Sequence, residues 1–494
     1  LLALAGGDGF EGGVFLNEAT NMVNFLAGRS REFCCGLGAF AFRNGKSLTV
    51  DAVDAGTASF SGIQAGSVVD IEVTSGALTV NQSIMASGLH DGAAILLTAA
   101  GNLVVNNDIT ATSSYGGAIG LMAGGNIALN GAEVRAESGS AYGGGISIIG
   151  FQAGGSITAT NSDIRATSVN GAAMIGMDAG TNIVLSGGEV RAESTVEEGA
   201  ASALVLEGSG PTIVGLRAGN NVTIGGDVIS EGGPGMEGWL LELPGFVPIP
   251  TGQGASSDAS GIVIQAGNRI IGGTGIVGAN SEQEIRLKAV NGIGTVPAPI
   301  KIIDADPDME FLNTGTAGDI AVSFIERDVV IDGDLVGTRN NNPNGTYFIE
   351  AKNGNLVLSV PFLPGEESSE PLLAGQSVTL AAKGNVHIAH GTFEPDLVAV
   401  DTYGSINASG SGKIKIDAGG AILTDAGTQL NASAIDLIAG TTVNSNGSLT
   451  GGAVSAEAGG NITLSQSQSI TLGLLESTAS NGTVTVSTGG AILD

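Results

Sequence analysis

The sequence predicts an all-β chain that folds as a right-handed parallel β-helix, a solenoid with three short strands in each turn. Glycine supplies 82 of the 494 residues, without the Gly-X-Y period of collagen. A short phrase recurs along the chain. The residues after it alternate apolar and polar with period two, and no helical period of 3.6 is sustained. Hydrophobic residues make up 42% and charged residues 13% of the chain, a balance too apolar for disorder.

The recurring phrase is Ala-Gly, one or two small or polar residues, and then an alternating apolar run. It reads AGGNIAL at Ala123, AGGSITA at Ala153, AGTNIVL at Ala179 and AGGNITL at Ala458. Successive copies are mostly ~20–35 residues apart, which is the period range of solenoid repeats. We call one such repeat a rung, meaning one full turn of the expected β-helix.

One rung shows how its three strands are expected to follow one another. The segment Asn126–Leu129 alternates as a strand, and the dipeptide NG after it is a turn signal. A second alternating strand, Glu133–Glu137, is followed by the glycine-rich loop Gly139–Gly145 and by a third strand, Ile146–Phe151. The apolar members of each strand should point inward, with neighbouring rungs ~4.8 Å apart.

The corners between strands account for much of the glycine and asparagine. A corner needs residues with positive φ, which glycine adopts without steric cost and asparagine tolerates better than other residues. Asparagines stacked at one corner can also bond to one another along the β-helix. The asparagine ladder predicted in this way contains Asn126, Asn182, Asn221, Asn385 and Asn461.

A row of arginines marks the second strand of three successive rungs. The octapeptides GAEVRAES, NSDIRATS and GGEVRAES place Arg135, Arg165 and Arg191 in matching positions. The arginines should point outward, one above the other, between carboxylates of their own and adjacent rungs. We interpret the row as a surface ionic ladder, worth only ~0.2–1 kcal/mol per exposed pair. The alternative is a binding row for an anionic glycan, which the flanking acids disfavour because they cancel its field.

Composition divides the chain into four segments. Residues 1–57 hold six of the fourteen phenylalanines and are expected to form an N-terminal cap or the remnant of an upstream region. Residues 58–230 and 401–494 read as regular β-helix, the latter continuing beyond a fragment. All thirteen prolines fall between Pro211 and Pro395, so residues 231–400 should carry loop insertions.

The clearest insertion, Glu231–Ser260, holds the only tryptophan of the chain. An exposed aromatic loop is a plausible contact site for a partner or a glycan. The alternative is that the loop folds back to cover apolar surface. The candidate contact residues are Trp239, Leu240 and Leu241.

The sequence DADPDME is the best local candidate for a cation site. Alternating carboxylates on a loop offer the hard oxygen ligands that Ca²⁺ prefers. The spacing departs from an EF-hand, and the alternative is a solvated acidic turn. The candidate ligands are Asp304, Asp306, Asp308 and Glu310.

The net charge of −30 excludes two classes of partner. A surface this acidic repels nucleic acid and anionic membranes. The sequence contains no run of 18 apolar residues, so no membrane span is expected. The partners that remain are a host or cell-surface receptor, a glycan, or copies of the chain itself.

The AGGNI-x-L phrases and the C-terminal units that contain GGAIL resemble the filamentous haemagglutinin family, the secreted exoproteins of the two-partner pathway and related autotransporter passengers. The resemblance covers residues 58–494. It implies a right-handed β-helix, secretion to the bacterial surface, and a role in adhesion or as a stalk. The family's N-terminal secretion domain, with its NPNG-type signal, is not visible at the start of the chain. Residues 342–345 do read NPNG, and we interpret them as a turn.

The function expected from the sequence is that of a non-enzymatic, secreted surface protein or adhesin. No HExxH, GxSxG, P-loop or dinucleotide fingerprint occurs. One alternative is a polysaccharide-degrading β-helix enzyme, a lyase or glycosidase, with its site near the acidic middle loops. A second alternative is a protomer that stacks end to end into a fibre.

Overall fold

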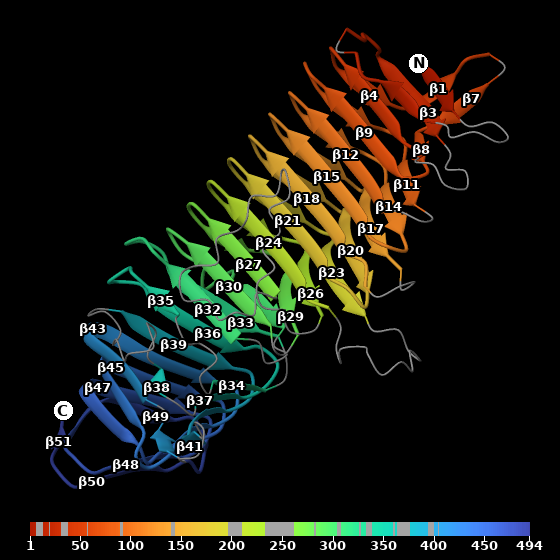
Figure 1. Cartoon of the computed structure of the whole chain (residues 1–494). Coiled ribbons are helices and arrows are strands. Elements are labelled where there is room, and N and C mark those ends of the chain that lie inside the picture. The colour runs from red at the N-terminus through yellow and green to blue at the C-terminus, as the bar shows by residue number, and fades with distance from the viewer. Residues whose placement is uncertain are drawn as a thin grey trace, which may run out of the picture. The chain divides into compact units, whose positions relative to one another are not determined.

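In the computed structural model, all the regular secondary structure of the described residues is β-strand, which confirms the predicted parallel β-helix (Figure 1). It describes all residues except 6–12, 19, 31–37, 57, 89–91, 140–143, 196–209, 233–260, 281–282, 304–307, 326–327, 332–337, 359–360, 363–375, 394–399 and 404. The chain divides into two compact units. Unit 1 comprises residues 1–267 and 273–285, and unit 2 comprises residues 268–272 and 286–494.

From β4 to β26, each rung of unit 1 contributes one strand to each of three parallel stacks, which we call faces A, B and C. Face A contains β2 (Val14–Leu16), β4 (Phe40–Asn44), β9 (Val68–Val73), β12 (Ala93–Ala99), β15 (Gly117–Ala123), β18 (Ser147–Ala153), β21 (Ala173–Ala179), β24 (Thr212–Ala218) and β27 (Gly261–Ala266). Face B contains β5 (Leu48–Val50), β10 (Leu78–Val80), β13 (Leu103–Val105), β16 (Ile127–Asn130), β19 (Ile157–Thr160), β22 (Ile183–Ser186) and β25 (Val222–Ile224). Face C contains β8 (Ile63–Ala65), β11 (Ile84–Gly88), β14 (Ile109–Ser113), β17 (Glu133–Ser138), β20 (Asp163–Val169), β23 (Glu189–Thr195), β26 (Asp227–Glu231) and β29 (Ile276–Ala279).

Parallel pairing in unit 1 already involves the first 57 residues. Strand β4 pairs with β9, and β5 pairs with β10, in the same register as later rungs. Strand β1 (Leu2–Ala5) pairs with β3 (Phe25–Ser30), and β6 (Ala52–Asp54) forms an antiparallel hairpin with β7 (Ser59–Ser61). The segment that was expected to be a cap or remnant therefore contributes strands to the ladder itself.

The core of unit 1 consists of columns of identical or similar side chains. Alternate residues point inward, so Val134, Ile164 and Val190 stack in register and are at most 2% exposed. Ile127 and Ile157 form a second such column. Burying a side chain of this size contributes ~1.5–3 kcal/mol, which repeats in every rung.

The glycine of the Ala-Gly phrase has a different role from the one expected. Gly124, Gly154, Gly180 and Gly219 do not have positive φ. A Cβ atom on Gly154 would instead lie 3.2 Å from the carbonyl carbon of Gly124, one rung earlier, and closer still to its oxygen. The same clash recurs at each of the others, against the equivalent position of the preceding rung. The prediction that these glycines adopt positive φ is therefore wrong at this corner, which lies between faces A and B and which we call the Ala-Gly corner. Glycine is needed here because two backbones approach too closely for a side chain.

Positive φ occurs at the corner between faces B and C. Gly131 has φ of +65°, and Asn161 and Gly187, at the equivalent position of the next two rungs, have +48° and +75°. A Cβ on Gly131 would meet nothing within 4 Å. At this corner the expected reason for glycine and asparagine holds, because only the backbone conformation restricts the residue.

Serine closes the corner between faces C and A from the inside. Ser138 and Ser168 stack in register and are at most 4% exposed. The Oγ of Ser168 donates to the carbonyl of Gly145 at 2.6 Å, and Ser194 donates in the same way to Gly171. The final serine of the VRAES sequence thus satisfies backbone carbonyls at a buried corner.

Unit 2 also stacks its strands in parallel, and some strands of its later rungs are longer than any in unit 1. One stack contains β31 (Ile300–Ile303), β33 (Ile320–Phe324), β36 (Thr346–Ala351), β39 (Ser377–Ala382), β43 (Ser405–Ala418), β45 (Gln429–Ala439), β47 (Ser448–Ala458) and β49 (Ile470–Ser477). The other contains β34 (Val329–Ile331), β37 (Leu356–Leu358), β40 (Val386–Ile388), β44 (Ile422–Thr424), β46 (Val443–Ser445), β48 (Ile462–Gln466) and β50 (Val484–Thr488). The remaining elements are β28 (Ile270–Gly272), β32 (Asp308–Asn313), β35 (Arg339–Asn340), β38 (Pro361–Phe362), β41 (His390–Phe393), β42 (Val400–Tyr403) and β51 (Ile492–Leu493), and β30 (Glu284–Ala289) spans residues of both units.

The later rungs of unit 2 depart from the pattern of three separate strands per rung. Strands β45 and β47 each run through two of the three positions without a loop, with a register shift where β43 pairs with β45. Ile422, Val443 and Ile462 are consecutive in one stack, so these rungs take 21 and 19 residues, against 30 between Ile127 and Ile157. A rung shortens because one corner loop is replaced by a bulge.

The NPNG sequence forms the expected turn. The backbone N–H of Gly345 donates to the carbonyl of Asn342 at 3.0 Å. Beside it the hydroxyl of Tyr347 accepts from the backbone N–H of Asn340 at 2.7 Å, and burial raises the pKa of that hydroxyl. The region is a buried polar corner in unit 2.

Candidate functional site

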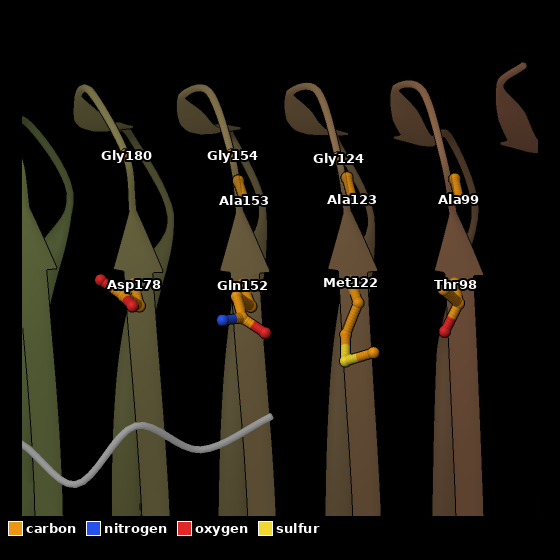
Figure 2. A pocket seen from close by; sticks show the side chains of 10 residues that line it. All are labelled: Thr98, Ala99, Met122, Ala123, Gly124, Gln152, Ala153, Gly154, Asp178 and Gly180. Atoms are coloured by element: carbon orange, nitrogen blue, oxygen red, sulfur yellow. The ribbon is translucent and has the colours of Figure 1, made fainter. Parts of the chain in front are cut away.

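A shallow groove in unit 1 follows the corner where face A turns into face B. Its volume is about 420 Å³, and it crosses the ends of β12, β15, β18 and β21. Thr98, Met122, Gln152 and Asp178 line one side and project in the same direction (Figure 2). These four residues are register partners on successive strands. The alanines and glycines of the Ala-Gly phrase line the other side, so the groove follows directly from the close approach of the corner backbones.

Ion pairs bound the side-chain column of the groove at both ends. The Arg217 guanidinium donates to both carboxylate oxygens of Asp178, at 2.9 and 2.6 Å. These hydrogen bonds raise the pKa of Arg217, although partial burial opposes them. At the other end Glu72, the register partner of Thr98, pairs with Arg43 at 3.0 Å. The groove is therefore neutral between two closed charge pairs.

A third carboxylate on face A lies beside this column. Burial, and then the charge of the neighbouring Glu72, raise the pKa of Asp70 above its ordinary value. Asp70 points outward from β9, on the same side of the strand as Glu72.

The groove offers contacts that suit binding better than bond cleavage. Thr98 and Gln152 supply hydrogen-bonding groups, and Met122 supplies apolar surface that adapts to a ligand. The one carboxylate, on Asp178, is already engaged by Arg217. An extended ligand lying along the stack could contact one side chain per rung.

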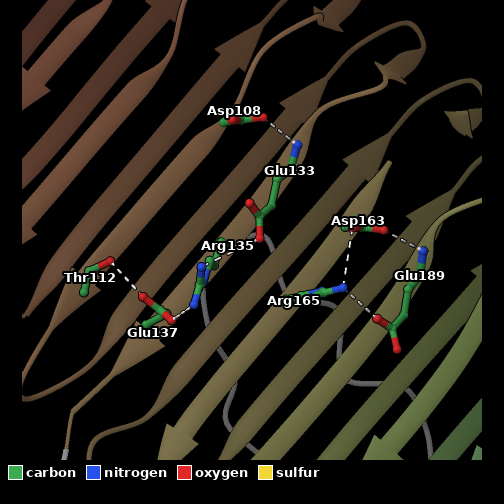
Figure 3. Close-up of polar contacts among 8 residues, drawn as sticks. All are labelled: Asp108, Thr112, Glu133, Arg135, Glu137, Asp163, Arg165 and Glu189. Carbon is green, nitrogen blue, oxygen red and sulfur yellow. Dashed lines mark hydrogen bonds and ion pairs between the residues drawn. The ribbon is translucent and has the colours of Figure 1, made fainter. Parts of the chain in front are cut away.

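The arginine row lies on face C in the expected register, and Figure 3 shows two of its members, Arg135 and Arg165. Arg135 pairs with Glu137 in its own strand and lies 3.9 Å from Glu133. Arg165 reaches Asp163 at 3.5 Å and Glu189 of the next rung at 3.1 Å.

The last arginine of the row extends the ladder by one more rung. Arg191 pairs with Glu189 and with Glu231. Burial acts to lower the pKa of Arg191, but hydrogen bonds to Glu231 and Glu189 hold it above its ordinary value. Every arginine of the row is thus engaged by carboxylates, which leaves little positive field for an anionic ligand.

A set of aspartates at the start of face C was missed by sequence reasoning. The Oδ1 of Asp108 accepts the backbone N–H of Glu133 at 2.9 Å, and the Oδ1 of Asp163 accepts that of Glu189 at 3.1 Å. Asp227 does the same for Ile276 at 3.0 Å. The signal available in the sequence was an acidic residue just before the alternating run of the second strand.

The asparagines of the Ala-Gly corner do form inter-rung hydrogen bonds, mostly with backbone partners, although the Nδ2 of Asn220 also donates to Asn182 Oδ1 at 3.0 Å. The Oδ1 of Asn126 accepts the backbone N–H of Ser156 at 2.8 Å, and that of Asn182 accepts the N–H of Asn221 at 3.2 Å. In unit 2 Asn385 and Asn461 accept from the following rung at 2.7 and 2.9 Å. None of these asparagines has positive φ, because the side-chain oxygen reaches the next rung from an ordinary backbone conformation.

Two predicted sites fall largely outside the described residues. This is true of Trp239, Leu240 and Leu241, and of Asp304 and Asp306, while Asp308 is described only as part of the backbone of β32. Glu310 forms an ion pair with Arg286. Among the residues that the structure describes, no three His, Cys, Asp or Glu side chains gather in a way that could hold a metal ion.

One histidine has a carboxylate neighbour in unit 2. His387 Nε2 lies 3.0 Å from Asp425 Oδ1, and both side chains are about one-third to two-fifths exposed. The pair lies on the stack of short strands, between β40 and the residue after β44. It is a surface contact between successive rungs.

No protein-family model, curated protein or solved structure matches the chain. In the described part of the chain, no helix has the length and apolar character that a membrane crossing requires.

Proposed function

We propose that the protein is a non-enzymatic structural protein of the bacterial cell surface, a β-helical stalk or adhesin that presents contact surfaces. The observation that carries the proposal is the register-matched side-chain ladder. On face C, arginines and carboxylates link consecutive rungs, and at the Ala-Gly corner asparagine oxygens accept backbone N–H groups of the next rung. The surface location and the adhesive role rest on the sequence resemblance alone.

The ladders support a mechanical role. A rung in a solenoid contacts only its neighbours, so its stability is the sum of its own terms and two interfaces. Side-chain ladders add to each interface beyond the backbone hydrogen bonds. A chain built in this way resists local opening, and resistance to local opening protects it from proteases and from pulling forces.

The corner groove is the described surface best suited to the contact role. Its three neutral side chains, Thr98, Met122 and Gln152, offer hydrogen bonds and apolar surface on successive rungs, and the ion-paired Asp178 stands on the fourth. A ligand bound there would be an extended chain, because the groove repeats one side chain per rung.

Binding and turnover assays together test this proposal. Incubation with acidic and neutral polysaccharides, with and without Ca²⁺, should yield no new chain ends. The protein should nonetheless adhere to cells or to an immobilised extended ligand, and Met122→Arg should weaken that adhesion more than the matched exposed change Met85→Arg on face C. Turnover of any polysaccharide would refute the structural role.

A further inference from the structure

Face B of unit 1 presents a column of short, uncharged side chains. The outward residue of each strand is the register partner of the next, and all are partly exposed. None is larger than valine, so the column forms a flat strip of methyl and hydroxyl groups. Its members are Thr79, Val104, Ala128, Thr158, Val184 and Thr223.

Polar columns that are held in place flank this strip on both sides. Along one edge the Nδ2 of Asn130 donates to Asn106 Oδ1 at 2.8 Å, and the Nδ2 of Asn106 donates to Asn81 Oδ1 at 3.0 Å. Along the other edge Asn126 Oδ1 is bound to the backbone of Ser156. Side chains that are already ordered lose little entropy when a partner docks against them.

Charge is distributed unevenly among the three faces. Face A carries the pairs Arg43–Glu72 and Asp178–Arg217, and face C carries the arginine row with its carboxylates. The strands of face B from β10 to β25 contain no charged residue. With a net charge of −30, two copies of this chain repel each other over their acidic surfaces. Of the three faces of unit 1, face B is the one over which that repulsion is weakest.

We propose that face B is a self-association surface, on which a second copy of the chain packs its own face B. An interface with twofold symmetry must be complementary to itself, and a charge-free, flat strip meets this condition where an acidic face does not. Two such sheets pack ~10 Å apart, with the threonine and valine methyl groups interdigitating.

The area of the strip sets the strength of the association. The six strands are ~4.8 Å apart, and the face is about five residues wide, at ~3.3 Å each, when the flanking polar columns are included, as from Asn126 to Asn130. Strip and flanks together cover about 500 Å² per copy. The ~1,000 Å² buried in total lies at the lower limit for a specific interface. The pairing should therefore be weak and dependent on concentration, and it should strengthen with salt, which screens the acidic faces.

Sedimentation velocity of the full chain over a range of concentrations tests the proposal. The wild-type sedimentation coefficient should rise with concentration. Thr79→Glu with Thr158→Glu should weaken the association about tenfold or more, because four carboxylates would be buried without partners. Thr110→Glu with Thr167→Glu is the matched control, since it adds the same charge to outward threonines of face C.

Three results would overturn the proposal: a wild-type chain that stays monomeric throughout, a control pair that weakens association as much as the face B pair, or an association that weakens as salt is raised. Circular dichroism checks that each variant keeps its β-structure. If the face B pair fails to fold, Ala128→Gln replaces it, because added bulk without charge should also disrupt flat packing. The scaffold role does not depend on this outcome, since it is tested by adhesion and turnover.

Discussion

Replacing Gly154 by alanine should destabilise unit 1 through a clash between two backbones. The added Cβ would lie 3.2 Å from the carbonyl carbon of Gly124 and nearer to its oxygen, where a side-chain carbon is not tolerated. Neither atom belongs to a flexible side chain, so the two rungs must move apart. Overpacking of this kind costs ~1–3 kcal/mol, and in a solenoid the cost falls on a single interface.

Gly131 provides the matched comparison, because its restriction is conformational. Its φ is +65°, open space surrounds it, and Asn161 already occupies the equivalent position one rung later. Gly131→Ala should cost ~1–2 kcal/mol, and Gly131→Asn should recover most of that loss. Gly154→Asn should be at least as damaging as Gly154→Ala.

Urea denaturation followed by circular dichroism measures these four variants against the wild type. The reasoning is refuted if asparagine rescues Gly154, or if it fails to rescue Gly131. Thr74 and Ala100 stand at the Ala-Gly corner in earlier rungs, so the steric requirement applies from Gly124 onward, where the added Cβ would meet the backbone carbonyl of the preceding rung.

Three further predictions concern single contacts. Arg165→Ala and Glu189→Gln should show a coupling energy of only ~0.2–1 kcal/mol in a double-mutant cycle, because Arg165 is 42% exposed. The coupling energy should decline as salt is raised. A larger coupling energy that does not depend on salt would contradict the interpretation of the row as a surface ionic ladder. Asp70→Asn should raise the melting temperature at pH 7, because the pKa of Asp70 is raised in the folded chain and its ionised carboxylate therefore destabilises the fold. The gain should vanish as the pH falls below 3.8, where the carboxyl group is protonated in both the folded and the unfolded chain. An equal gain at all pH values would show that the charge of Asp70 is not the cause. Ser168→Ala should cost about 1 kcal/mol, because it removes the hydrogen bond to the carbonyl of Gly145 while Ser138 still donates to that oxygen; a neutral substitution would show that the buried serine is dispensable.

The strand pattern and the register of unit 1 could be predicted because both follow from period-two alternation. The three copies of the VRAES-like octapeptide fixed which residues pair, and Arg135, Arg165 and Arg191 do stack as their spacing required. The inward valines and isoleucines followed from the same alternation. Alternation and spacing are local properties of the sequence, and they recur in every rung.

The reason for the glycine at the Ala-Gly corner could not be predicted in the same way. A positive φ and a close backbone approach select the same residue, and only the position of the preceding rung distinguishes them. Gly131 follows an asparagine and Gly154 follows an alanine, and both were expected to be corner glycines with positive φ, yet only Gly131 has positive φ, while Gly154 makes room for the preceding rung.

The partners of polar side chains were also beyond the sequence. The asparagine oxygens of Asn126 and Asn182 bind backbone N–H groups, which carry no sequence signal. The corner groove arises from Gly124, Gly154 and Gly180, in three rungs that are ~25–30 residues apart along the chain, so it exists only once the rungs are stacked. The merged strands β45 and β47 reflect the loss of a loop, which shortens the repeat but leaves the alternation unchanged.

The measurement that most directly tests the stacked-rung account is electron paramagnetic resonance on paired spin labels. After Cys34 and Cys35 are replaced by serine, cysteines at Thr158 and Val184 would carry the labels on adjacent strands of face B. The backbones of this pair lie one rung, ~4.8 Å, apart, so spin exchange should merge the lines of the spectrum into one. Labels at Ala128 and Val184 lie two rungs, ~10 Å, apart and should show dipolar broadening without exchange. Exchange in the second pair, or its absence in the first, would contradict the register on which the whole account depends.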